Sequence, residues 1–208
     1  SSTKRLSAAR GPVRLCLGID HAAAGREYGQ AAVLTQVQQF VAANGRTREA
    51  LNVLDEVVMI GSATSNQFGG EIANMLRRNG LAWRDLWQAW GDIPAASRTA
   101  WKSNQEVERA VALAYGIHVN AMAPRIRNAK DGPGSAGALD SGCRYQYEQL
   151  VDDLINIHPR CERLIEAFEL WDYDPKHAHK DVLDGLRYGL KEFILPRHTR
   201  GGVGVRIG

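Results

Sequence analysis

Apolar positions dominate the first part of the chain, in runs that are typical of β-strands. Residues 13–20, VRLCLGID, form a nearly continuous apolar run that ends in an acid, as expected for a strand buried on both faces. Residues 28–38 and 50–60 contain several β-branched residues and predict two further strands. The short connections, including the turn signal Asn44-Gly45, indicate an antiparallel meander at the start of a sheet.

Helical and strand-like patterns alternate in the middle of the chain. Residues 64–79 carry apolar side chains at helical spacing, which predicts a helix. The next run, residues 81–91, contains three of the five tryptophans and predicts a strand whose tryptophans lie in the core. Residues 103–106, Ser-Asn-Gln-Glu, have the form of a capping box and predict a helix that ends at about residue 115.

The second half of the chain is richer in helical patterns. A strand is predicted at residues 117–126, and the Gly-, Ser- and Ala-rich residues 131–142 predict a mobile loop. Helices are predicted at residues 145–157, 159–171 and 180–190, the last with leucines repeated on one face. This order, rich in strands first and in helices last, predicts an α/β fold in which helices flank a mixed sheet.

The distribution of charge separates a central domain from two basic ends. The 208 residues, 44% hydrophobic and 24% charged, suit one globular domain, which we assign to residues 13–195. Residues 1–12 have the composition of a linker, and residues 196–208 form a basic, Gly-rich tail expected to be flexible. Residues 1–14 and 197–208 hold seven basic residues and no acid, so the other 19 basic and 23 acidic residues give −4, against +3 overall. A polyanion would therefore need local cationic patches or bound metal ions.

Several classes of protein are excluded by what the sequence lacks. No apolar run approaches the ~20 residues of a membrane helix, and the basic N-terminal segment has no apolar region of a signal peptide. Cys16, Cys143 and Cys161 are odd in number and have no CxxC spacing, so we expect neither disulfides nor a zinc site. The motifs GxxxxGK[ST] and GxSxG are missing, which argues against a phosphate-loop ATPase and a serine hydrolase.

Four aspartates lie at the ends of predicted elements. Asp20 and Asp92 each follow a strand-like run, and Asp181 and Asp184 are three residues apart in the opening turn of the last helix. Carboxylates packed together repel one another, so such a cluster is stable only when it is protonated or bridged by cations. Hard oxygen ligands favour Mg²⁺ or Mn²⁺, and two such ions ~3.5–4 Å apart can promote phosphodiester hydrolysis. Each acid taken alone is more simply a helix cap or a solvated loop residue.

Histidines lie next to two of these acids. His177 and His179 precede Asp181 and could belong to a metal site, but a His-x-His pair in a polar loop is more often solvated surface. His21 directly follows Asp20, and we expect it to lie at the surface or to support a ligand rather than to be one.

Several segments resemble, in amino-acid sequence and in their order along the chain, those of one known family. This family is the C-terminal nuclease domain of the large subunit of tailed-phage terminases, which has an RNase H-like fold. The matching segments are LGIDHA (17–22), LNVLDEVVMIGS (51–62), GDIPAA (91–96), AKDGPGS (129–135), NIHPRCERLIEAFELWDYD (156–174) and KDVLDGLRY (180–188). The last is the most specific. The family commonly has an acid or His three residues before an Asp that is followed by A-x-R-Y. Here these acids are Asp181 and Asp184, and Gly185 replaces the usual Ala.

The resemblance implies an RNase H-like α/β fold, with a mixed sheet whose first three strands are antiparallel and whose later strands are parallel, flanked by helices. It also implies a metal-dependent endonuclease that cuts concatemeric viral DNA with little sequence specificity, using two Mg²⁺ or Mn²⁺ ions. Asp20, Asp92 and Asp184 are then the main metal ligands, and Asp181 is an auxiliary ligand or orients one.

Double-stranded DNA is the partner that this resemblance implies first. Arg125, Arg127 and Lys130, beside the predicted glycine-rich loop, could follow backbone phosphates, although an ordinary solvated hairpin explains them equally well. In a full-length protein the resemblance also implies an N-terminal ATPase domain, a portal and a small terminase subunit, all in the host cytoplasm. We expect the isolated domain to be a monomer and not to bind membranes.

Two other functions fit the same pattern. One is a different RNase H-like nuclease, such as a Holliday-junction resolvase or a transposase core, which would prefer branched DNA or transposon ends. The other is a non-catalytic docking module of a packaging motor, which would keep its fold and its partners but cut nothing.

Overall fold

The protein is described here by a computed structural model. The described residues are 13–21, 29–41, 45, 47–61, 63–91, 100–129, 155–170 and 179–190. The predicted linker at 1–12, the loop at 131–142 and the tail at 196–208 lie outside them.

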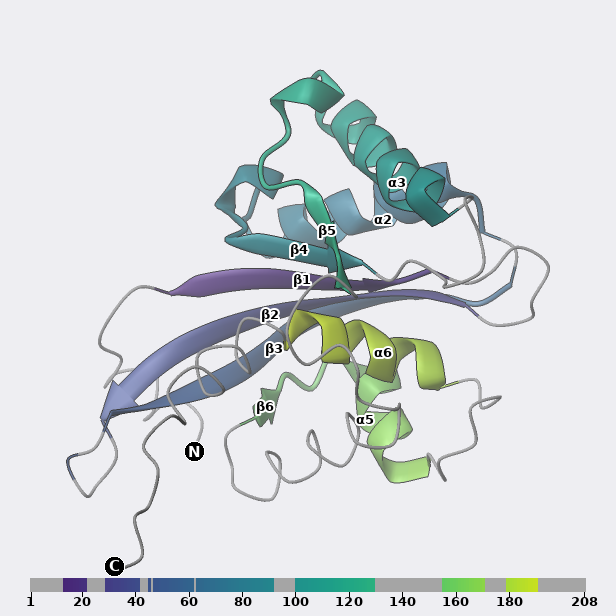
Figure 1. Cartoon of the computed structure of the whole chain (residues 1–208). Coiled ribbons are helices and arrows are strands. Elements are labelled where there is room, and N and C mark those ends of the chain that lie inside the picture. Colours follow the sequence, from purple (N-terminus) through teal and green to yellow (C-terminus); the bar gives the residue numbers. More distant parts are fainter. Residues whose placement is uncertain are drawn as a thin grey trace, which may run out of the picture.

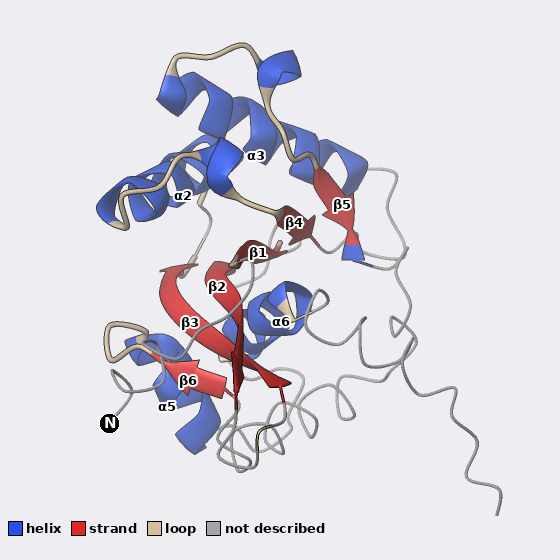
Figure 2. Cartoon of the chain, turned by 90° about the vertical axis from the view of Figure 1, so that its left-hand side faces the viewer, coloured by secondary structure: helices blue, strands red, loops and turns tan. Residues whose placement is uncertain are grey.

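One mixed sheet forms the centre of the described structure (Figure 1), with the strand order β5-β4-β1-β2-β3-β6. The strands are β1 (Arg14–Asp20), β2 (Gln30–Val41), β3 (Thr47–Met59), β4 (Gln88–Gly91), β5 (Ile126–Asn128) and β6 (Ile155–Ile157). β1, β2 and β3 form the predicted antiparallel meander. β4 and β5 continue the sheet parallel to β1, and β6 runs parallel to β3 at the opposite edge (Figure 2). The predicted mixture of antiparallel and parallel strands is confirmed.

Helices cover both faces of this sheet. α2 (Ser65–Arg78) and α3 (Ala100–Tyr115) lie on one face, and α5 (Glu162–Leu170) and α6 (Lys180–Gly189) lie on the other (Figure 1). Among the described residues no helix is both long and apolar enough to span a membrane. The architecture is the predicted RNase H-like α/β fold.

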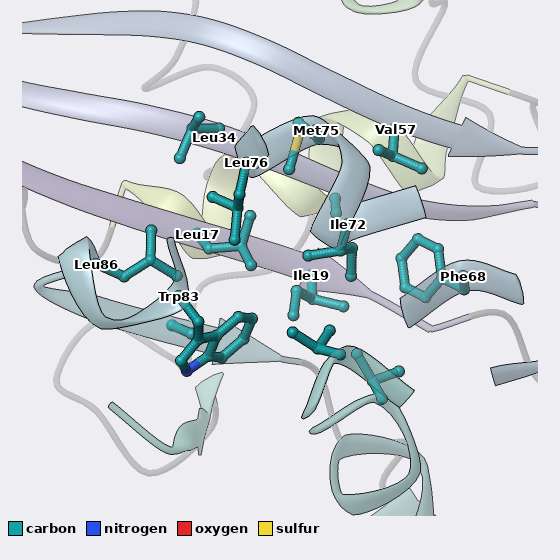
Figure 3. Packing of buried hydrophobic residues seen from close by; sticks show 14 of the residues in the cluster. Leu17, Ile19, Leu34, Val57, Phe68, Ile72, Met75, Leu76, Trp83 and Leu86 are labelled. Carbon is teal, nitrogen blue, oxygen red and sulfur yellow. The ribbon is translucent and has the colours of Figure 1, made fainter. Parts of the chain in front are cut away.

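The core between the sheet and α2 follows from alternation along the strands. Leu17 and Ile19, two residues apart in β1, point to this side and pack on Phe68 and Ile72 of α2 and on Trp83 (Figure 3). α2 begins where the sequence predicts, because Thr64 caps it by accepting a hydrogen bond from the backbone N–H of Gln67.

A second core fills the space between the sheet and the C-terminal helices. Ala31 and Val33 of β2 point to this side and belong to the same buried cluster as Leu164 of α5 and Leu183 and Leu186 of α6. The spacing of the leucines in the predicted helix 180–190 predicts one buried face, and this is confirmed, because these leucines pack against the sheet.

The predicted strand at residues 81–91 is mostly wrong. Only Gln88–Gly91 is a strand, and Trp83–Asp85 forms a 3₁₀ helix, η1. The Asp85 carboxylate accepts a hydrogen bond from the backbone N–H of Ala82, and this short-range contact favours a turn over an extended chain. Trp83 and Trp90 are buried as predicted, but Trp87 is 60% exposed.

The capping box predicted at residues 103–106 is also wrong. α3 already includes Ala100, so this segment lies inside the helix, where its backbone N–H groups have helical partners. Glu106 instead accepts a hydrogen bond from the hydroxyl of Ser65 at the start of α2. The end of the helix is as predicted, at Tyr115, followed by Gly116 with φ 65°.

Two other assignments change in the second half of the chain. The strand predicted at 117–126 is replaced by a 3₁₀ helix, η2 (Val119–Ala121), and only β5 is extended. A helix was also predicted at residues 145–157. Residues 155–157 instead form the strand β6, and residues 145–154 lie outside the described part. The apolar pattern of such short segments does not distinguish a buried strand from a buried helix.

Candidate functional site

The site is built on a close approach of α6 to β1. A β-carbon at Gly18 would overlap the carbonyl oxygen of Gly185 and the backbone of Gly189. A β-carbon at Gly185 would lie 3.2 Å from Cγ2 of Val33, which is also tight. The helix therefore lies backbone against backbone on the strand, and glycines are required where the two elements meet.

Three of the four predicted aspartates lie on these two elements, β1 and α6. Asp20 is two residues after Gly18, so it lies on the same face of β1 as α6, whereas Ile19 lies on the other face. Asp181 and Asp184 stand one turn apart on α6, as their spacing predicts. All three residues are buried, with Asp20 4%, Asp181 7% and Asp184 2% exposed.

Two cationic side chains of α6 hold the carboxylate of Asp184. Lys180 Nζ lies 2.6 Å from its Oδ2, and Arg187 Nε lies 2.9 Å from its Oδ1. Lys180 Nζ also lies 4.0 Å from Oδ1 of Asp181. Arg187 donates a further hydrogen bond of 2.9 Å to the hydroxyl of Tyr188. The Asp184 carboxylate thus has a cation on each oxygen.

The electrostatics show that Asp20 belongs to the same cluster. Burial opposes the charge of Lys180, but the carboxylates of Asp184, Asp20 and Asp181 outweigh it and raise the pKa of this ammonium. Burial also opposes the charge of Arg187, and Asp184 and Asp20 contribute to a net rise of its pKa. These three carboxylates and two cations therefore form one electrostatically coupled group.

The fourth predicted aspartate, Asp92, lies outside the described residues. The strand before it is described: β4 runs parallel to β1, and Gly91 pairs with Ile19. Asp20 ends β1, and Gly91 ends β4, so the C-terminal ends of both strands are at one edge of the sheet.

Asn104 of α3 lies between the ends of these two strands. Its side chain packs on Gly91, where an added β-carbon would overlap the amide oxygen. The same oxygen makes a hydrogen bond with Nε2 of His21, and because an amide oxygen only accepts, the imidazole donates. Asn104 is itself buried, so it is placed to fix the chain next to Asp20. His21 is thus half-buried and paired with Asn104 rather than an isolated surface group.

Of the three cations predicted to contact DNA, two are described. Arg127 is exposed on β5, and its guanidinium lies 5.7 Å from the centre of the Trp90 ring. Arg125 is paired with the buried Glu108 of α3, to which its Nε donates a hydrogen bond of 3.0 Å. Lys130 lies outside the described residues.

Sequence reasoning missed four residues of this site. Lys180 and Arg187 could have been found from their spacing, because they lie four residues before and three after Asp184. Gly18 also carried a signal, since a glycine within an apolar strand often marks a close backbone approach. Asn104 carried none, because its role depends on contacts between distant segments.

The donor atoms fit a hard divalent cation in kind, since buried carboxylate oxygens gather around a positive charge that a side chain supplies. Within the described ranges, however, no three Asp, Glu, His or Cys side chains are grouped so as to hold a metal ion. Both oxygens of Asp184 contact Lys180 or Arg187 instead.

Comparison with known proteins gives one structural likeness. The chain is similar to the nuclease domain of the P22 large terminase, with 16% sequence identity and a TM-score of 0.56, over 92% of this chain and 89% of that domain. At this identity the likeness shows the fold. No protein-family model and no curated protein matches the sequence.

Proposed function

We propose that this chain is the metal-dependent DNA endonuclease domain of a viral DNA-packaging terminase. The observation that carries the proposal is the burial of Asp20, Asp181 and Asp184 on one face of β1, beside the end of β4. Three buried acids lower the stability of a fold unless they bind cations, and such arrangements are common at functional sites. The likeness in fold to a terminase nuclease domain supports this reaction over others that carboxylates perform.

Asp20, Asp92 and Asp184 are the proposed ligands of two divalent ions, Mg²⁺ or Mn²⁺, and Asp181 is an auxiliary ligand or orients one. When bound, such ions supply Lewis acidity for attack by water on a phosphodiester and for departure of the leaving oxygen. The protein positions the ligands: contacts with Gly18 hold α6 against β1, and Asn104 holds the ends of β1 and β4. Pairing of Gly91 with Ile19 supports the inclusion of Asp92.

Double-stranded DNA is the proposed substrate, cut with little sequence specificity. Arg127, exposed on β5 next to β4, is well placed to contact backbone phosphates close to the carboxylates. In a longer protein this domain would work with an ATPase domain, a portal and a small terminase subunit, in the host cytoplasm.

Plasmid cleavage tests the proposal. Supercoiled plasmid should be nicked and linearised with Mn²⁺ or Mg²⁺ and left intact with EDTA. Asp20→Asn should reduce the rate by more than about a hundredfold, since even partners of metal ligands contribute ~10–100-fold. The matched control is Glu71→Gln, which removes an exposed acid from α2 and should cut at the wild-type rate. Metal-dependent cleavage that persists in Asp20→Asn would reject the assigned site.

The choice of substrate separates the proposal from its rivals. A terminase domain should cut plain duplex as well as branched DNA, whereas a junction resolvase should cut a four-way junction at least about tenfold faster. A folded protein that cuts neither substrate with either metal would favour a docking module.

A further inference from the structure

The position of Lys180 has a consequence for how the carboxylates bind metal. Its ammonium lies 2.6 Å from Oδ2 of Asp184 and 4.0 Å from Oδ1 of Asp181, and the Asp20 carboxylate also acts on it. The side chain of Lys180 is only 29% exposed, so this is not an ordinary surface ion pair. This ammonium, which belongs to α6 itself, therefore interacts with all three carboxylates.

Local helix energetics do not explain a lysine here. Lys180 is the first residue of α6, and the N-terminus of a helix carries a partial positive charge that disfavours cations. Lys180 also precedes Asp184 by four residues, which is the less favourable order for an i,i+4 pair. An acid stabilises a helix more when it precedes the base than when it follows. A residue that opposes the local preference in this way is a candidate for a functional role.

Arg187, the other cation on Asp184, is held more firmly. It contacts Asp184 and the Tyr188 hydroxyl, and its guanidinium lies 4.7 Å from the centre of the Tyr188 ring. Among the described residues, Lys180 has a single short contact, with Asp184, and it lies on a flexible four-carbon stem. When a divalent ion competes for the Asp184 oxygens, Lys180 is therefore the cation that can leave.

We propose that Lys180 is a built-in counterion that holds the carboxylates together without metal and competes with divalent ions for Asp184. This inference rests on the proposed function, because it concerns the same carboxylates. A divalent ion that binds Oδ2 of Asp184 must first displace the ammonium. The apparent affinity for the ion is then lowered by the fraction of molecules in which the Lys180–Asp184 pair is open. Lys180 thereby prevents the site from binding metal at low concentrations.

Titration calorimetry with Mn²⁺ alone, without DNA, tests this at constant ionic strength. Lys180→Met keeps the aliphatic stem and removes the charge, and should bind Mn²⁺ about tenfold more tightly than wild type if the pair is closed in about nine molecules of ten. Lys180→Arg keeps the charge and should bind close to wild type. The matched control is Arg163→Met, which removes a cation from an exposed i,i+3 pair on α5 and should not change the affinity.

Metal-free Lys180→Met should also be less stable than wild type in urea, and saturating Mn²⁺ should remove the difference. If the metal-free variant does not fold, addition of Mn²⁺ should restore its fold, because the ion takes over the role of the ammonium. Failure of Mn²⁺ to restore it would overturn the proposal.

Other outcomes separate this inference from the proposed function. If wild type binds Mn²⁺ and cuts plasmid, but Lys180→Met binds Mn²⁺ equally or more weakly, Lys180 is no competitor and the nuclease assignment stands. If neither protein binds Mn²⁺ and wild type cuts nothing, the metal site itself is rejected, and the role of Lys180 with it.

Discussion

The backbone of Gly18 in β1 lies directly against the backbone of Gly185 in α6, with no space for a β-carbon on residue 18. This approach determines how near the aspartates of α6 come to Asp20. A larger residue at either position would push the helix away from the strand, and the carboxylates would separate with it. The glycines are thus as necessary to the proposed site as the acids.

Gly18→Ala should therefore lower both stability and cleavage. Overpacking of a tight core contact costs about 1–3 kcal/mol, and the atoms that would be overlapped here are backbone atoms, which move least easily. We expect a loss near the upper end of that range in urea unfolding, and loss of plasmid cleavage under conditions where the variant is still folded. Gly70→Ala is the matched control: nothing lies within 4 Å of an added β-carbon in α2, so it should gain about 0.5–1 kcal/mol. Equal behaviour of the two variants would contradict the packing argument.

Asp55 of β3 provides a buried acid whose role is structural. Its carboxylate accepts hydrogen bonds from Arg78 Nε at 2.7 Å and from Asn79 Nδ2 at 2.6 Å, and burial, which would raise its pKa, is outweighed by these partners, so the pKa is lowered. Asp55→Asn should cost about 2–3 kcal/mol at pH 7, because hydrogen bonds to a charged group are lost. Its metal-dependent cleavage, measured on the folded protein, should stay within about twofold of wild type, unlike that of Asp184→Asn.

The same residue predicts a pH dependence. Because the pKa of Asp55 is lower in the folded than in the unfolded protein, its contribution is fully present above the unfolded value of about 4 and is lost as the pH falls through the folded value. The difference in unfolding free energy between wild type and Asp55→Asn should therefore shrink between about pH 5 and pH 2. Urea titrations at four or five pH values measure it, and a difference that stays constant would show that the carboxylate is not paired as described.

Arg127→Ala should weaken binding of duplex DNA without changing the fold. Loss of one phosphate contact should reduce the slope of log affinity against log salt by about 1, and to the same degree for different sequences. Fluorescence anisotropy with Ca²⁺ in place of Mg²⁺ measures binding without cleavage. Arg84→Ala removes an exposed arginine from η1, which precedes the opposite end of β4, and should leave both the affinity and the salt slope unchanged.

Asn104→Ala should lower the cleavage rate while Mn²⁺ still binds. The amide packs on Gly91 and accepts a hydrogen bond from His21, so its loss releases the chain next to Asp20. We expect a ~10–100-fold lower rate, as for residues that orient ligands, with a change in Mn²⁺ affinity of less than about tenfold. Asn104→Gln, which keeps the amide but displaces it, should be intermediate. A wild-type rate for Asn104→Ala would exclude a positioning role.

Much of this fold could be predicted from the sequence, because its strongest patterns are local. The apolar run that ends in Asp20, the spacing of leucines in residues 180–190 and the helix that follows Thr64 are properties of neighbouring residues, and the structure confirms each. The likeness of the last motif to a terminase nuclease led to the right fold. Where the local signal was short, as at residues 81–91 and 117–126, tertiary contacts determined the outcome and the predictions were wrong.

The sequence by itself determined which residues could act, namely the acids and their spacing on one helix turn, and the antiparallel order of the first three strands. Tertiary structure alone decided that Asp20, Asp181 and Asp184 all act on Lys180, because this depends on how closely α6 lies on β1 at Gly18. It also decided that Lys180 lies among these carboxylates and that Asn104 joins His21 to Gly91. Periodicity predicts which face of an element is buried, whereas the distance between two elements depends on the few atoms in contact between them.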